Sequence, residues 1–226
     1  PLEAQGALLT RANLDDVSYT DPNRVRSTSG QVFATFFPRR VDRTTDVLSG
    51  ILRSTDPTLV PGRGIVRFRD HVEVGPSSLR EWSEAPAWDL CGERLAFWSP
   101  SSDAVLWLDL NGEPVRSVPL DQAPSALTTD DIEAYLRWMA RIELGPSATP
   151  RRPDIARLAR SVRDRFAVTR PRVMDLRCED HRAVWIQQFD TSHDPLGRGR
   201  IWRRVSIDGS TLTVQFPTRF RPLLFF

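Results

Sequence analysis

The sequence has two cysteines, three histidines and no lysine, so all of its 31 basic residues are arginine. No apolar run approaches the roughly 20 residues that a membrane-spanning helix needs, and we expect no membrane span. The 31 basic residues oppose 29 acidic ones, and a net charge of +2 gives no strong field toward nucleic acid. A phosphate-binding surface would not exclude lysine so completely. We therefore predict no nucleic-acid partner.

Signature motifs of several enzyme classes are also missing. The sequence contains no Gly-x-Ser-x-Gly, no His-Glu-x-x-His and no Cys-x-x-Cys. His71 falls in an expected strand and His181 in a tight turn, and neither has a nucleophile or an orienting partner close by in sequence. The glycines of 197–200 lack the strand-to-helix context of a phosphate loop. The sequence thus favours a non-enzymatic protein, and we name no catalytic residue.

Two stretches of the chain repeat one another. CGERLAFW at 91–98 and CEDHRAVW at 178–185 share a cysteine, an alanine and a tryptophan at identical spacing. Each copy predicts four short strands, and Asn-Gly or Asp-Gly dipeptides at 111–112 and 208–209 predict tight hairpins. The expected strands are 87–91, 94–99, 104–110 and 114–120 in the first copy and 172–178, 182–189, 201–207 and 210–217 in the second.

A third, more degenerate copy is expected before these two, with strands at 30–37, 44–52 and 64–74. A repeated four-stranded meander is the blade of a β-propeller, in which each sheet packs its faces against its neighbours. We therefore predict an all-β fold: a partial β-propeller of about three four-stranded antiparallel blades, forming a single domain over residues 1–226.

The two cysteines, Cys91 and Cys178, occupy equivalent positions of the repeat. Equivalent points of blades rotated about an axis should lie farther apart than the roughly 7 Å between Cα atoms that a disulfide tolerates. We therefore expect two free, buried thiols.

A helical insertion is expected at 128–167, between the blades at 87–120 and 172–217. Apolar residues recur at helical spacing over 128–144, where Thr129 and Asp130 are available as caps, and again over 154–166. The stripes include Ile142 and Leu158, and stripes this regular predict packing rather than a cofactor site.

The lengths of the connections differ between the two ends of the expected blades. Strands of a meander alternate in direction, so the turns after the first and third strands share one end. The longer segments 100–103, 121–171 and 190–200 share the other, here called the long-loop end. Long irregular segments on a rigid scaffold commonly carry binding. The candidate binding residues at this end are Asp190, His193, Asp194, Arg198 and Arg200.

A carboxylate and imidazole cluster of this kind can bind a metal or move a proton. Three ligands from one loop, without a second histidine nearby, make a poor metal site, so we predict no metal site and no cofactor. Asp175 and Asp180 flank a strand and offer an alternative, since carboxylates that face an axial channel bind calcium in some propeller hydrolases.

The order of motifs resembles one family. PAW, LAFW, LWLDLNGEPVRSVPL, ALTTDDIEAYL, PRVMDLRCEDHRAVWIQ and IWRRVSIDGSTLTVQFP follow one another as in the C-terminal half of uncharacterised bacterial six-bladed β-propeller proteins, which are similar to NHL-repeat propellers. The resemblance covers about 85–217 well and 1–84 loosely. It implies a periplasmic, envelope-associated or secreted protein with a binding or scaffold role.

Three blades do not close a ring, and the segment 221–226 is expected to begin a further strand. We therefore expect a fragment of a six-bladed ring or an open stack that self-associates through an exposed edge. The expected function is a non-enzymatic module that binds a protein or polysaccharide through the long-loop end. The alternative is a propeller hydrolase or lactonase with a central divalent metal, which requires at least three oxygens around one point near the axis.

Overall fold

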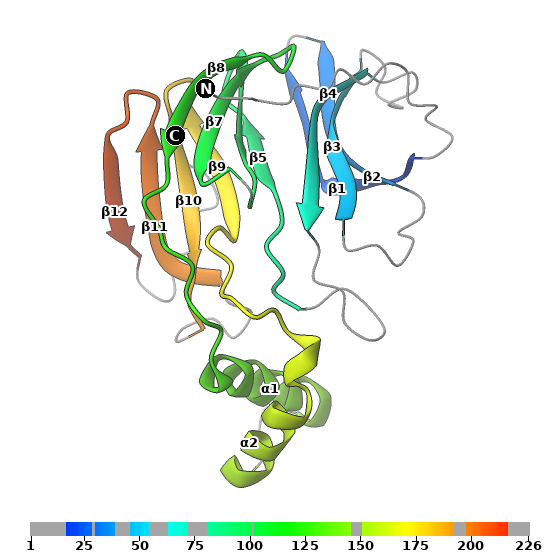
Figure 1. Cartoon of the computed structure of the whole chain (residues 1–226), viewed down its shortest axis with the longest axis vertical. Coiled ribbons are helices and arrows are strands. Elements are labelled where there is room, and N and C mark those ends of the chain that lie inside the picture. The colour runs from blue at the N-terminus through cyan, green and yellow to red at the C-terminus, as the bar shows by residue number, and fades with distance from the viewer. Residues whose placement is uncertain are drawn as a thin grey trace.

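The computed structural model describes residues 17–28, 30–38, 46–54, 63–71, 81–100, 102–145, 151–191 and 198–216. Three four-stranded antiparallel sheets account for most of this part of the chain, and each sheet keeps its strands in sequence order (Figure 1). Two helices connect the second sheet to the third. The chain is thus rich in strands and built from repeated meanders, as predicted.

The elements have the following bounds. The first sheet comprises β1 (Val17–Thr28), β2 (Gln31–Pro38), β3 (Asp46–Ser54) and β4 (Arg63–His71). The second comprises β5 (Ala87–Leu90), β6 (Arg94–Trp98), β7 (Ala104–Asp109) and β8 (Pro114–Pro119). The helices are α1 (Thr129–Leu144) and α2 (Arg152–Ser161), followed by a 3-10 turn (Arg163–Arg165). The third sheet comprises β9 (Asp175–Asp180), β10 (Ala183–Phe189), β11 (Arg198–Ser206) and β12 (Thr211–Gln215).

Two details of the strands differ from the prediction. The sequence does not predict β1, which carries Asp-Pro-Asn at 21–23 and a register shift against β2 between Thr20 and Val25. Such an irregularity removes the period-two alternation by which a strand is recognised. The turn expected at 179–181 also moves by two residues. The Asp180 carboxylate accepts the backbone N–H groups of Arg182 and Ala183, at 2.7 and 3.0 Å, so β9 continues to Asp180 before the chain turns.

Both predicted helices are present, with different ends. The N-cap of α1 is Thr128 rather than Thr129 or Asp130, because a capping box joins Thr128 to Asp131 at the third helical position. The second helix begins two residues early, with Pro153 in its first turn, and divides at Val162 into α2 and the 3-10 turn. None of the helices in the described segments has the length and apolar character that spanning a membrane requires.

The sheets pack face to face. Phe33 and Ile51 of the first sheet pack into a core with Leu95 and Phe97 of the second. The opposite face of the second sheet packs on the third, through a larger core that includes Trp98, Trp107, Val118, Leu176, Val184, Ile186 and Val205. Successive residues of β6 and β7 therefore point alternately into one core and the other. Because both faces of these strands are buried, their sequences are nearly continuous apolar runs.

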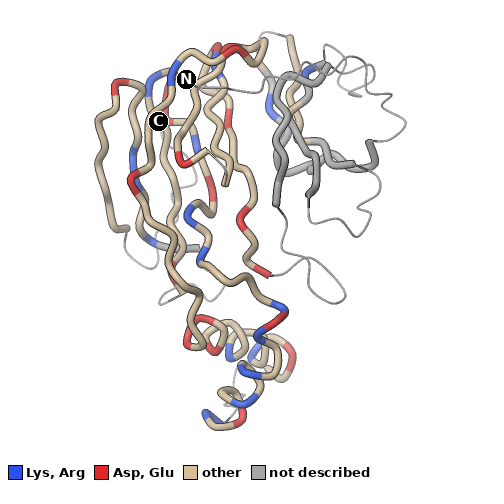
Figure 2. The backbone as a smooth tube through the Cα atoms, in the orientation of Figure 1, with Lys and Arg blue, Asp and Glu red and all other residues tan. Residues whose placement is uncertain are grey.

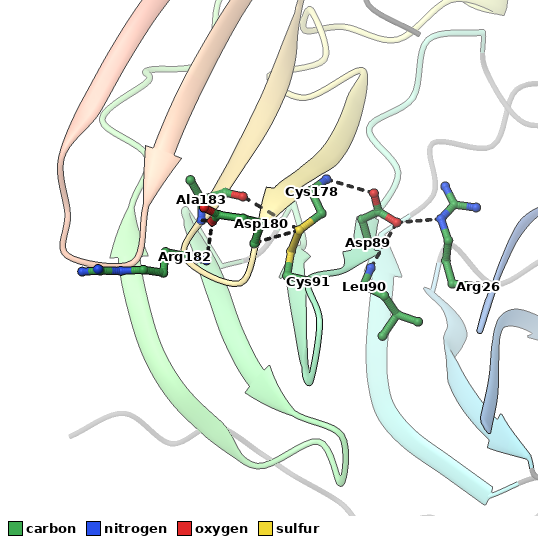
Figure 3. The surroundings of a disulfide bond; sticks show 8 residues. All are labelled: Arg26, Asp89, Leu90, Cys91, Cys178, Asp180, Arg182 and Ala183. Atoms are coloured by element: carbon green, nitrogen blue, oxygen red, sulfur yellow. Dashed lines mark hydrogen bonds and ion pairs between the residues drawn. A yellow bond between two sulfur atoms is a disulfide. The ribbon is translucent and has the colours of Figure 1, made fainter. Parts of the chain in front are cut away.

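Cys91 and Cys178 form a disulfide, so the expectation of two free thiols is wrong (Figure 3). Their Cα atoms lie 5.4 Å apart. Both residues belong to the first hairpins of their sheets, and β5 and β9, the first strands, lie side by side. The three sheets fan out from a line where they converge. Equivalent residues of two sheets therefore lie farther apart the farther they are from that line. At the first strands this distance is small, and equivalent residues come within bonding range.

A buried carboxylate lies beside the disulfide. Asp89 of β5 accepts a hydrogen bond from Arg26 Nε of β1 at 2.6 Å and from the backbone N–H of Cys178 in β9 at 2.9 Å (Figure 3). One side chain therefore joins the first strands of all three sheets. The indole N–H of Trp88 adds a further link by donating to Thr35 Oγ1 at 2.7 Å.

Replacing both cysteines by alanine is expected to lower the free energy of unfolding by about 2–4 kcal/mol, because the cross-link restricts the unfolded chain across a separation of 87 residues. Urea denaturation of the oxidised protein, the reduced protein and the Cys91→Ala, Cys178→Ala variant measures the effect. The reduced protein should match the variant. An oxidised protein with the same midpoint as the variant would contradict this role.

Candidate functional site

The long-loop end lies where α1 and α2 extend away from the sheets (Figure 1). The contacts of its residues bring together the segment before β5, the β6–β7 loop, both helices and the end of β10. Two ionic networks and one aromatic cluster join these segments.

The first network is centred on Asp131, which is buried in the first turn of α1. Its carboxylate accepts the backbone N–H and the hydroxyl of Thr128, both at 2.8 Å, Arg170 Nε at 2.9 Å and the hydroxyl of Thr191 at 2.6 Å. Burial by itself raises the pKa of Asp131, but the hydrogen bonds from Arg170, Thr191 and Thr128 outweigh it and hold the pKa below its ordinary value. The network fixes the start of α1 to the residues that follow β10.

The second network is centred on Arg172, which is almost fully buried in the link between the helices and β9. Its Nε and Nη2 atoms donate to the two carboxylate oxygens of Glu84 at 3.0 and 3.1 Å, and its Nη1 atom donates to Asp103. The guanidinium also lies over the Trp98 ring, 5.5 Å from its centroid. The hydrogen bonds to Glu84 and Asp103 raise the pKa of Arg172. The guanidinium therefore remains charged. It ties the link before β9 to the segment before β5 and to the β6–β7 loop of the second sheet.

The aromatic cluster packs α1 and the segment after α2 against the end of β10 in the third sheet. Trp82 contacts Tyr135 of α1, Phe166 and Phe189 of β10, with ring centroids 5.5, 5.3 and 5.1 Å apart. Burial, followed by the negative charge of Glu81, raises the pKa of the Tyr135 hydroxyl. Tyr135 thus remains neutral in the physiological range and acts here as a packing residue.

The predicted binding residues are only partly brought together. Asp190 directly follows β10 and is half-buried. Arg198 and Arg200 belong to β11 rather than to a loop, since Phe189 pairs with Arg198, and the loop is therefore shorter than expected. His193 and Asp194 lie outside the described residues. Whether these five residues bind a ligand stays a prediction.

The calcium alternative receives no support from the two aspartates proposed for it. Asp175 accepts the N–H of Leu176 at 2.9 Å and Arg177 Nε at 2.7 Å, and Asp180 closes the β9–β10 turn. Both carboxylates therefore have local structural partners. Among the residues that the structure describes, no three His, Cys, Asp or Glu side chains gather closely enough to hold a metal ion.

The distal part of the helix pair exposes large apolar side chains. Ile142 is 59% exposed, Leu144 73% and Leu158 45%. Ile142 and Leu158 belong to the stripes predicted to pack, and for them that prediction is wrong. The residues of α1 that join the hydrophobic cluster are Ile132, Tyr135 and Leu136, whereas its last turn, 141–144, is exposed. An amphipathic pattern cannot reveal this, because it repeats along a helix whether or not a neighbouring element continues beside it.

Positions of both charge signs are interspersed along the helix pair (Figure 2). The basic side chains on the exposed side of the pair are Arg141, Arg151, Arg152, Arg157 and Arg160, and the acidic ones include Glu143 and Asp154. The mixture differs from the single-sign stripe that nucleic-acid binding requires.

Replacing Asp131 by asparagine is expected to lower stability by about 1–3 kcal/mol, because Arg170 and Thr191 lose a charged acceptor. The folded pKa of Asp131 lies below its unfolded value. Its contribution is therefore complete above the unfolded pKa of about 3.9 and disappears as pH falls through the folded value. Thermal denaturation from neutral to acidic pH should show the wild-type and variant curves converging below about pH 4. Parallel curves would contradict this account.

No protein-family model, curated protein or solved structure matches the chain. The resemblance to six-bladed propeller proteins thus stays a prediction from the sequence motifs, and the geometry of the long-loop end carries the functional argument.

Proposed function

We propose that the chain is a non-enzymatic binding or scaffold module, built as three consecutive blades of a β-propeller, that binds a partner through its long-loop end. Three features support the fold. The sheets follow one another in sequence order, their first strands lie side by side, and their faces pack on each other through continuous apolar cores. Blades of a propeller are arranged in this way.

The observation that carries the functional part is the exposed apolar tip of a firmly anchored helix pair. Asp131 and Arg172 hold the base of the insertion to two different sheets. A segment held this firmly does not need exposed Ile142, Leu144 and Leu158 for its own stability. Exposed aliphatic side chains with surrounding charges are typical of protein interaction sites, where an apolar centre lies within a polar rim.

A protein partner fits these residues better than a polysaccharide does. The tip offers aliphatic groups and arginines, and arginine is enriched in protein interfaces. Asp190 lies beside Thr191, which bonds to Asp131 at the base of α1, so Asp190 would take part only if the partner reaches from the tip to the base of the helix pair.

The disulfide supports export. Disulfides persist in oxidising compartments and are rare in reducing ones. The Cys91–Cys178 bond thus favours a periplasmic, envelope or secreted location.

The experiment compares capture of envelope proteins of the source organism by the full chain and by surface variants. Ile142→Asp with Leu158→Asp places charges on the tip, and we expect retention of the partner to fall at least about tenfold, because a buried unpaired charge costs several times RT. A second variant replaces 192–197 by a Gly-Ser linker and should weaken retention less.

Val115→Asp is the matched control. Val115 is 47% exposed, but it lies in β8 beside the short 111–113 turn, at the opposite end of the second sheet. Its partner retention should equal that of the wild type. The proposal is wrong if the tip variant, shown to be folded by circular dichroism, retains every partner that the control retains.

A further inference from the structure

The last strand of the third sheet forms an open edge. In the described part of the chain, β12 pairs with β11 and with no other strand. Thr211, Leu212, Thr213 and Gln215 are exposed, and Leu212 is 55% exposed. Open edges pair readily with other strands unless charge, proline or distortion prevents it.

The corresponding strand of the second sheet carries such protection. β8 begins and ends with proline, at 114 and 119, contains Arg116, and is irregular where it pairs with Trp107 and Leu108. β12, with the sequence TLTVQ, has neither a proline nor a charge, and its pairing with β11 is regular over all five residues. The repeat therefore presents one protected edge and one unprotected edge.

The backbone groups that point outward from β12 follow from its pairing. The N–H of Phe216 bonds to Arg200 and the N–H of Ser206 bonds to Ser210. Hydrogen-bonded pairs alternate along an antiparallel ladder, so Leu212 and Val214 direct their backbone groups toward β11. Thr211, Thr213 and Gln215 direct theirs outward. The backbone N–H and C=O groups of these three alternate residues are available to a further strand.

The side chains of β12 are symmetric about Thr213. Polar Thr211 and Gln215 are equidistant from it, and so are apolar Leu212 and Val214. A second β12, antiparallel and centred on the same residue, would set Thr213 opposite Thr213, Thr211 opposite Gln215, and Leu212 opposite Val214. The outward-pointing residues then form the hydrogen-bonded pairs, with about six new backbone hydrogen bonds. Polar groups meet polar groups, and apolar groups meet apolar groups, on each face.

We propose that β12 is a homodimerisation edge: two copies of the chain pair β12 with β12 in this register, about a two-fold axis at Thr213, and form a continuous eight-stranded sheet. Exposed Leu212 then lies beside Val214 of the second copy, on the face that also carries Trp185 and Trp202. The contact is isologous, so it closes at two copies and does not propagate into a fibre. The long-loop end takes no part in it.

Two double variants with the same number of substitutions test the register. Thr211→Lys with Gln215→Lys sets lysine opposite lysine at both ends of the contact. Thr211→Lys with Gln215→Glu sets lysine opposite glutamate. The residues of β11 directly opposite the two positions, Val205 and Ile201, are uncharged. Arg203 lies diagonal to both positions, but within the same copy, so its effect is present in monomer and dimer alike and the difference in association between the variants reports the second copy. Sedimentation equilibrium over a concentration series should show a dimer for the wild type and the Lys/Glu variant, and a monomer for the Lys/Lys variant.

Thr213→Pro tests the backbone contact. Its N–H points outward, so proline removes no bond to β11 but blocks the central pair, whereas Thr213→Val keeps that N–H. We expect a monomer from the proline variant, with unchanged circular dichroism, and a dimer from the valine variant. Three results would overturn the proposal: a wild type that stays monomeric at all concentrations, equal association of the Lys/Lys and Lys/Glu variants, or a folded proline variant that still dimerises.

Discussion

The arrangement of this protein depends on how the first strands of the three sheets meet. There the Asp89 carboxylate binds Arg26 of the first sheet and the Cys178 amide of the third, next to the Cys91–Cys178 bond. A buried carboxylate is costly unless it has such partners. Because β1, β5 and β9 are held together at this point, the directions in which the sheets diverge are fixed. The positions of the strand ends follow from those directions.

The long-loop end shows how polar groups are divided between structure and surface. Asp131, Arg170 and Thr191 anchor the start of α1, and Arg172 with Glu84 and Asp103 anchors the link to β9. These groups use their hydrogen-bonding capacity on one another, which leaves the apolar tip of the helix pair as the part of the insertion without a structural role in the described contacts. Rigid anchoring lowers the entropy lost when such a tip binds a partner.

Local sequence patterns predict local structure here, and long-range partners explain most of the failures. Apolar strand patterns, the Asn-Gly and Asp-Gly turns and, for the first sheet, similarity to the two clear copies locate eleven of the twelve strands in the described residues, because each signal lies within a few residues of its effect. The disulfide, the Asp89 bridge and the Arg172 network join residues far apart in sequence, and Arg172 and Glu84 are separated by 88 positions. Nothing near Arg172 distinguishes it from the other arginines. The exposure of Ile142 likewise depends on where the neighbouring core ends.

An internal repeat also indicates where packing is incomplete, because each copy shows what the equivalent residues of another copy do. In the second sheet the row Trp98, Val105 and Val118 is buried against the third sheet. The equivalent row of the third sheet is Trp185, Arg204 and Leu212, which are half-buried or exposed. Arg204 replaces a buried valine and pairs with Glu179 at 2.7 Å, which suits a face in contact with water. Trp202 and Ser206 of the same face stay buried, so only part of this face of the third sheet meets water. The outermost strand, TLTVQ, carries neither a charge nor a proline. An edge without charge or proline is suited to pairing with a further strand, as proposed for β12.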